Sequence, residues 1–166
     1  ADLVKDSLTP LNRDDIHCIL QEPQLGTGHA VFQAYNALRD FQGTLVILCA
    51  DTPLLTNETI SELIDYHTHS SSDISILSAK LDDPTGYGRI IRNENGNVEK
   101  IIEERDATTE QKKIDEINAG VYCIEWYKVS QAFLELSSNN SQCEYYLTDI
   151  VEWASKQNLK VQAHSL

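Results

Sequence analysis

The segment Thr44–Leu55, which reads TLVILCADTPLL, constrains the fold of this chain more than any other. Five consecutive apolar residues, Leu45–Cys49, are followed closely by Asp51 and Pro53. A short, unbroken apolar run that is rich in β-branched residues predicts a strand buried on both faces of a parallel sheet. Proline has no N–H to donate to a sheet ladder, so we expect the strand to end near Ala50.

Asp51 then lies at the carboxyl end of a central strand, where open α/β sheets bind their ligands. A carboxylate at this place suits a hard cation that carries phosphate. A second interpretation is an aspartate that only caps the turn before Pro53, and the segment alone favours neither.

Length and charge limit the class of protein. A chain of 166 residues, 41% of them hydrophobic, predicts one domain with its own core. The formal net charge of −13 argues against nucleic-acid and anionic-membrane partners, because both are polyanions. It leaves a nucleotide ligand open, since a small site can recruit a metal. No apolar run approaches the roughly 18 residues that span a bilayer, and no signal-peptide pattern opens the chain.

The sequence holds four cysteines and no methionine. Cys18, Cys49, Cys123 and Cys143 form no C-x-x-C pair, and three of them lie in or beside apolar runs. We therefore expect buried, free thiols in a reducing, cytoplasmic compartment. Because the sequence lacks an initiator methionine, we expect that it begins inside a longer protein.

The spacing of apolar residues predicts an alternation of helices and strands. Helices are expected at 1–8, 29–38, 56–66, 127–136 and after Thr148, which would cap the last of them. Strands are expected at 16–20, 44–50, 73–81, 89–92, 98–103, 114–126 and 159–163. Asn95-Gly96 predicts a tight hairpin turn. His67 and His69, one residue apart near a helix end, are expected to be solvated.

Polar residues gather at three predicted strand ends, at Gln21–Thr27, at Asp51, and at Glu103 with Asn118. Each residue alone is more often part of a turn or of the surface, and glycines such as Gly26 and Gly28 more often only make a turn. Together they fit a cleft that reads the hydroxyl and amide groups of a sugar. A triad hydrolase and a structural zinc site are disfavoured, because no G-x-S-x-G motif exists and the cysteines are dispersed.

Five motifs follow one another in order: QEPQLGTGHA, ADTPLL, LDDPTGYGRI, EINAGVY and EYYLTDI. Together they closely resemble the uridylyltransferase (pyrophosphorylase) domain of the bacterial N-acetylglucosamine-1-phosphate uridylyltransferase family. The resemblance implies an α/β, Rossmann-like nucleotide-diphospho-sugar transferase fold. Its sheet would be mixed and mostly parallel with a β-hairpin excursion, and would lack the first strand and Gly-rich loop. Residues 1–166 would form a partial nucleotidyltransferase domain, truncated at both ends.

The resemblance also implies roles for nine positions. Uracil would be held by Gln21, Gly26 and Thr27, the nucleotide by Cys49, Ala50 and Asp51, and N-acetylglucosamine by Gly88, Glu103 and Asn118. Asp51 would be the catalytic residue and would hold Mg²⁺, the expected cofactor. The implied reaction transfers uridylyl from UTP to N-acetylglucosamine-1-phosphate and gives UDP-N-acetylglucosamine, a peptidoglycan precursor.

The sequence departs from the family pattern in three places. The Gly-rich phosphate loop with its lysine and a second metal ligand have no counterpart, and Cys49-Ala50 stands where the family often has tyrosine and then glycine. We therefore expect this chain alone to be inactive. The alternatives are a non-catalytic uridine- or sugar-nucleotide-binding module and a nucleotidyltransferase for another sugar-1-phosphate. A sheet without its first strand would expose the apolar edge at Leu45–Cys49, which predicts a homo-oligomer.

Overall fold

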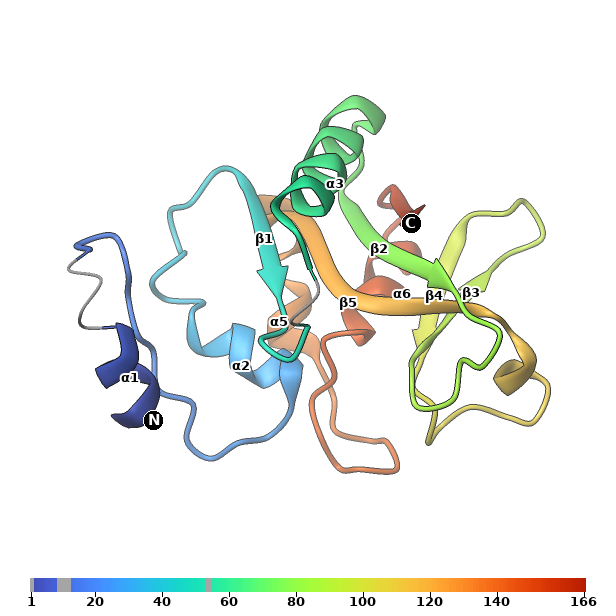
Figure 1. Ribbon diagram of the computed structural model, residues 1–166, viewed down its shortest axis with the longest axis horizontal. Helices are drawn as coiled ribbons and strands as arrows, with labels where there is room; N and C mark the ends of the chain where they lie inside the picture. The colour runs from blue at the N-terminus through green and yellow to red at the C-terminus, as the bar shows by residue number, and fades with distance from the viewer. Residues whose placement is uncertain (1, 9–12, 53–54) are drawn as a thin grey trace.

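The structure is a computed structural model that describes residues 2–8, 13–52 and 55–166. It is a mixed α/β fold with a six-stranded sheet (Figure 1). The strands are β1 (Thr44–Leu48), β2 (Ile74–Lys80), β3 (Arg89–Arg92), β4 (Val98–Ile102), β5 (Glu116–Glu125) and β6 (Val161–Ser165). The helices are α1 (Asp2–Leu8), α2 (Thr27–Gln33), α3 (Asn57–Ser70), α4 (Trp126–Val129), α5 (Ala132–Glu135) and α6 (Asp149–Lys156), with a 3₁₀ turn, η2, at Gln111–Lys113.

The long strand β5 lies at the centre of the sheet. It is antiparallel to β2 along one edge, and its other edge is shared by β3 near the start and β1 near the end. β4 extends the sheet beyond β3 as the predicted hairpin, and β6 extends it beyond β2. Among the described residues only β2 and β6 are parallel neighbours, so the expectation of a mostly parallel sheet is wrong. β1 and β2 do run in the same direction, but the antiparallel β5 lies between them.

β1 is less buried than its apolar sequence predicts. It pairs with β5 alone among the described residues, so its other edge has no partner there. Leu48 ends the strand and is 48% exposed. Leu45 and Ile47 pack against one apolar cluster and Val46 against the other, so β1 is covered on both faces, but none of its residues is fully buried. The prediction of an exposed apolar edge is confirmed for the described part of the chain.

Helices cover both faces of the sheet, and β5 supplies side chains to both. Val121 and Cys123 pack with Leu63 of α3 on one face. Tyr122 and Ile124 belong to the larger cluster that includes α4, α5 and α6 on the other face. Because successive side chains of a strand point to opposite faces, an unbroken apolar run here indicates burial on both sides.

Several local predictions are confirmed and others are not. The hairpin turn closes through Gly96 N, which donates to Asn93 O at 2.9 Å. The segment 16–20 is irregular and largely exposed instead of a buried strand. The predicted helix at 127–136 is divided into α4 and α5, and the one at 29–38 ends at Gln33.

All four cysteines are free, as expected, but only Cys123 is buried, and Cys18 and Cys143 are exposed. Among the described residues, no helix has both the length and the apolar character needed to cross a membrane.

His67 is buried, contrary to the expectation of a solvated histidine. Helix α3 continues to Ser70, so His67 falls one turn after Leu63 on the same buried face. Its Nδ1 lies 2.8 Å from Ser75 Oγ on β2, and its Nε2 lies 3.2 Å from Glu125 Oε1 on β5. Thr44 Oγ1 on β1 donates to the same carboxylate oxygen at 2.7 Å. His67 thus connects α3 to β2 and β5, and Glu125 extends this hydrogen-bond network to β1.

We predict that His67→Ala lowers the free energy of unfolding by about 1–3 kcal/mol, because it leaves the fully buried Ser75 hydroxyl without its partner. Urea denaturation at pH 7 measures the loss. The matched control is His69→Ala on the same helix, where the exposed imidazole lies within hydrogen-bond distance of the backbone oxygen of Asp65. The control is expected to change stability by less than about 0.5 kcal/mol, and an equal loss in both variants would contradict the role of His67.

Candidate functional site

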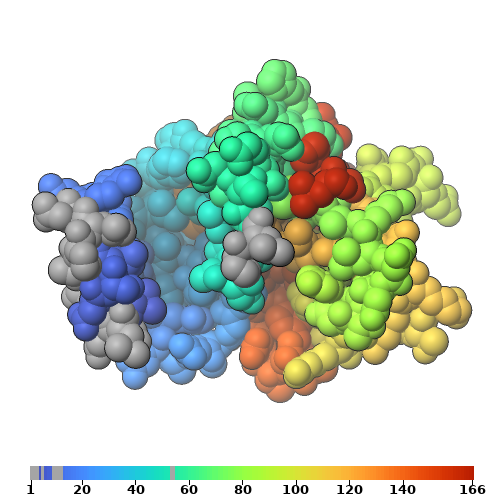
Figure 2. All heavy atoms as spheres, in the orientation of Figure 1, coloured from blue at the N-terminus to red at the C-terminus, as the bar shows by residue number. Residues whose placement is uncertain are grey.

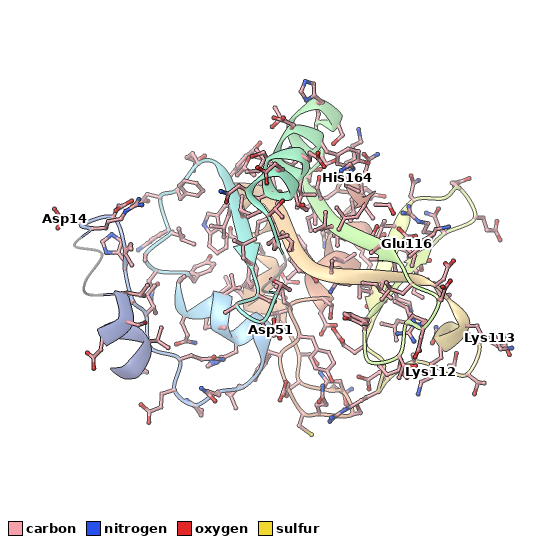
Figure 3. The ribbon with its side chains drawn as sticks, viewed as in Figure 1. Asp14, Asp51, Lys112, Lys113, Glu116 and His164 are labelled. Atoms are coloured by element: carbon pink, nitrogen blue, oxygen red, sulfur yellow. The ribbon has the colours of Figure 1, made fainter. Side chains whose placement is uncertain are left out.

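The candidate site lies where three segments meet at one side of the sheet. These are the turn after β1, the loop 81–88 that leads into β3, and the segment 144–148 that leads into α6. Figure 2 shows the surface hollowed between the segment after β1 and the loop before β3. In Figure 3, Asp51 lies at the tip of the turn that leaves β1.

The three residues expected to bind a sugar lie together. Asn118 N on β5 donates to Gly88 O at 2.9 Å. A Cβ on Gly88 would lie 3.5 Å from Glu103 Oε2, an ordinary contact distance, so the carboxylate lies directly beside this backbone. Gly88, Glu103 and Asn118 therefore form one group, although they come from three separate parts of the chain.

Glu103 follows β4, and its carboxylate is held by Thr148, which was expected to cap α6. Thr148 Oγ1 donates to Glu103 Oε1 at 3.0 Å. Thr148 does occupy the position before α6, but its side chain makes no capping hydrogen bond. The prediction of a threonine cap is therefore wrong, and Thr148 is a site residue that was missed. Its place inside the EYYLTDI motif was the signal that could have identified it.

Burial raises the pKa of the Glu103 carboxyl above its ordinary value. The hydrogen bond from Thr148 acts in the opposite direction, and the carboxylate of Asp106 raises the pKa further. Because Oε1 is engaged by Thr148, Oε2 is the oxygen that remains as an acceptor on the side of Gly88.

The turn after β1 brings Asp51 and Cys49 to the same site. Burial raises the pKa of the Cys49 thiol, and the carboxylates of Asp51 and then Glu103 add to this effect. The Cys49 Sγ lies 3.4 Å from the position of a Cβ on Gly120, so the turn packs against β5. These contacts link the predicted nucleotide end of the site to the predicted sugar end.

The carboxylate of Asp51 is exposed and makes no hydrogen bond within the described part of the chain. The side-chain bond that shapes the turn is made by Thr52, whose Oγ1 donates to Cys49 O at 2.7 Å. Ala50, the third residue of this predicted group, is exposed in the same turn. The residues that Asp51 would cap, 53 and 54, lie outside the described part of the chain, so the cap and the ligand both remain open interpretations of this carboxylate.

The predicted uracil group begins with Gln21. Its Nε2 donates to Gly26 O at 2.9 Å and lies 3.2 Å from His29 Nδ1. The amide nitrogen thus has two partners in the protein, and the carboxamide oxygen is the atom left for a ligand.

The loop of Gly26 and Thr27 is bound to the segment that precedes α6. Thr27 Oγ1 accepts from Leu147 N at 3.0 Å, and Tyr145 exchanges backbone hydrogen bonds with Leu25 and Gly28 at 2.8 Å each. Gly26 has φ of +111°, and a Cβ there would lie 2.6 Å from Tyr145 O. Gly26 therefore allows two backbone segments to lie close together. The sequence alone had favoured a glycine that only makes a turn.

A cavity of about 450 Å³ lies beside Glu103, between β4 and α6. Burial raises the pKa of Asp149 to about 6, with further contributions from the carboxylates of Glu152, Glu103 and Asp106. Among the described residues, no three His, Cys, Asp or Glu side chains are grouped so that they could hold a metal ion. Protein ligands alone therefore do not build a complete metal site in this part of the chain.

The family model described as nucleotidyl transferase matches residues 3–165 of this sequence. The chain belongs to the nucleotidyl transferase family. The family resemblance carried by the five motifs is thereby confirmed, and the mixed α/β fold is consistent with the Rossmann-like fold expected of a nucleotidyl transferase.

The relatives of this nucleotidyl transferase include bifunctional proteins from several bacteria. It is 47% identical to the bifunctional protein GlmU of Halalkalibacterium halodurans, over 99% of this chain and 35% of the relative. It is 49% identical to the bifunctional protein GlmU of Prochlorococcus marinus, over 94% of this chain and 34% of the relative. It is 43% identical to that of Limosilactobacillus fermentum, over the whole chain and 36% of the relative. The chain thus spans about a third of the length of these curated relatives.

Proposed function

We propose that this chain is the nucleotide- and sugar-binding part of a uridylyltransferase that makes UDP-N-acetylglucosamine from UTP and N-acetylglucosamine-1-phosphate. The observation that carries the proposal is the grouping of Gly88, Glu103 and Asn118 beside the exposed carboxylate of Asp51. Membership of the nucleotidyl transferase family supports the same reading of the site.

The sugar end offers the polar groups that a sugar requires. Glu103 Oε2 is available to accept from a hydroxyl, because Oε1 is engaged by Thr148. The carboxamide of Asn118 has both donor and acceptor capacity and suits hydroxyl and acetamido groups alike. Few, fixed polar groups of this kind set the orientation of a small ligand.

The base end favours uracil over cytosine. With the amide nitrogen of Gln21 engaged by Gly26 and His29, its oxygen is left as an acceptor. Uracil presents an N–H donor at N3, whereas cytosine presents an acceptor there, and two facing acceptors repel each other. The pocket therefore discriminates through one hydrogen bond that only uracil can complete.

In the proposed reaction, an oxygen of the sugar phosphate attacks the α-phosphorus of UTP and pyrophosphate leaves. Transfer of this kind depends mostly on positioning the two reactants and stabilising negative charge. The residues of this chain would hold the sugar against Glu103 and Asn118 and the base against Gln21, which brings the reacting groups to the end of β1.

We also propose Mg²⁺ as the cofactor, held by Asp51. Mg²⁺ typically takes one or two carboxylates, keeps several waters and binds substrate phosphate, and a single exposed carboxylate fits this pattern. When bound, the ion would supply charge neutralisation at the phosphates of the nucleotide.

The pyrimidine preference tests the proposed function. We expect isothermal titration to give at least about fivefold tighter binding of UDP-N-acetylglucosamine than of CDP-sugars, since one unmade hydrogen bond costs about 1–3 kcal/mol. Gln21→Ala should remove most of this preference. Gln131→Ala, which changes an exposed glutamine on the surface, is the control and should leave it unchanged. Equal affinity for uridine and cytidine compounds would contradict the proposal.

A separate binding experiment tests the assignment of Asp51 as the Mg²⁺ ligand. We expect Mg²⁺ alone to show no sub-micromolar site, but to strengthen the binding of UTP to the chain in a way that Asp51→Asn abolishes. Asp14→Asn is the control, because Asp14 is an exposed aspartate at the N-terminal side of the molecule, away from Asp51 (Figure 3). Tight Mg²⁺ binding that survives Asp51→Asn would overturn the assignment.

We further propose that two copies of the chain associate along the free edge of β1, because an unpaired apolar strand edge recruits other strands. Sedimentation velocity over a range of concentrations should show a dimer that Leu48→Lys weakens. Leu134→Lys on α5 is the control, since Leu134 is 49% exposed and Leu48 is 48% exposed. A monomer at every concentration would contradict this association.

We also propose a cytoplasmic location for this protein. The four free thiols support it, because a reducing compartment keeps cysteines in this state.

A further inference from the structure

The side chain of Asn118 is held at both ends by its own strand. Its Oδ1 accepts from Gly120 N at 3.0 Å, and its Nδ2 donates to Tyr122 Oη at 2.7 Å. The backbone of Asn118 is fixed as well, because its N–H donates to Gly88 O. Little freedom remains for this carboxamide.

A bulge in β5 produces this arrangement. The pairing with β2 shifts register between Ile76, which faces Tyr122, and Ser78, which faces Asn118. Gly120 lies inside the shift and has φ of +78°, a left-handed conformation that favours glycine. The bulge frees the N–H of Gly120 from the sheet ladder, and this N–H donates a hydrogen bond to Asn118 Oδ1.

A count of hydrogen-bonding capacity shows what the carboxamide can offer. It has two N–H donors and two lone pairs on its oxygen. One donor is taken by Tyr122 and one lone pair by Gly120, so one N–H and one lone pair remain. Rotation of the amide by 180° would set its NH₂ group against the N–H of Gly120, so the two internal bonds together select one orientation.

Tyr122 is suited to hold this orientation without touching a ligand. Its side chain is 1% exposed and lies in the main apolar cluster. Burial raises the pKa of the phenol above its ordinary value, and the carboxylate of Glu103 raises it further, so the hydroxyl stays neutral at physiological pH.

We propose that Tyr122 is a positioning residue, whose buried hydroxyl fixes the carboxamide of Asn118 so that one N–H and one oxygen lone pair face the N-acetylated sugar in the cleft. This inference rests on the proposed function, since it names the residue that orients a group of the same site.

Tyr122→Phe removes only the hydroxyl. We expect isothermal titration to show binding of UDP-N-acetylglucosamine weakened about five- to tenfold, while binding of UDP is unchanged, because UDP lacks the sugar. Tyr66→Phe is the matched control. It removes a hydroxyl that donates to Gln162 Oε1 at 2.9 Å, a pair that involves none of the site residues, and should leave both affinities unchanged.

A double-mutant cycle separates positioning from a general effect on the fold. In the Asn118→Ala background, Tyr122→Phe is expected to cause no further loss of affinity, because the group that it positions is gone. A loss that persists in that background, or one that affects UDP equally, would overturn the proposal.

The side-chain amide of Asn118 gives a readout that needs no ligand. NMR of the free chain should show slow hydrogen exchange of this amide, and Tyr122→Phe should accelerate it, whereas Tyr66→Phe should not. Failure of the unaltered chain to bind UDP-N-acetylglucosamine would contradict the proposed function. Unchanged amide exchange in Tyr122→Phe would contradict the role of Tyr122 alone.

Discussion

The backbone pairing of β5 is the interaction on which the rest of this structure depends. β5 bonds to β2 along one edge and to β3 and β1 along the other, so it joins the hairpin, the β1–α3–β2 unit and the C-terminal strand into one sheet. Its alternating side chains supply both apolar clusters. A strand that is paired on both edges and buried on both faces fixes the relative position of every layer.

The same strand also organises the site. Its bulge at Gly120 directs the carboxamide of Asn118, and the turn that carries Cys49 packs against it. Glu103 is fixed by a hydrogen bond from Thr148, in the segment that leads into α6. The side chains of Asn118 and Glu103 are therefore held by hydrogen bonds inside the protein, and groups fixed in this way lose little freedom when a ligand binds.

The surroundings of the site are acidic. The chain carries a formal net charge of −13, and the carboxyls of Glu103 and Asp149 both lie where burial and neighbouring carboxylates raise the pKa. A phosphate that enters such surroundings meets an unfavourable field. A cation at Asp51 would offset that field, so the proposed use of Mg²⁺ and the acidity of the chain are consistent with each other.

The sequence by itself determined the family, the hairpin turn and the buried apolar strands β2 and β5, because each depends on a motif or on residues adjacent in the chain. It also grouped Gly88, Glu103 and Asn118, but only through resemblance to a known family. Tertiary structure alone decided that β5 lies between β1 and β2 and that Thr148 bonds Glu103 instead of capping α6. Each of these outcomes depends on contacts between residues far apart in the chain, and local periodicity carries no information about such partners.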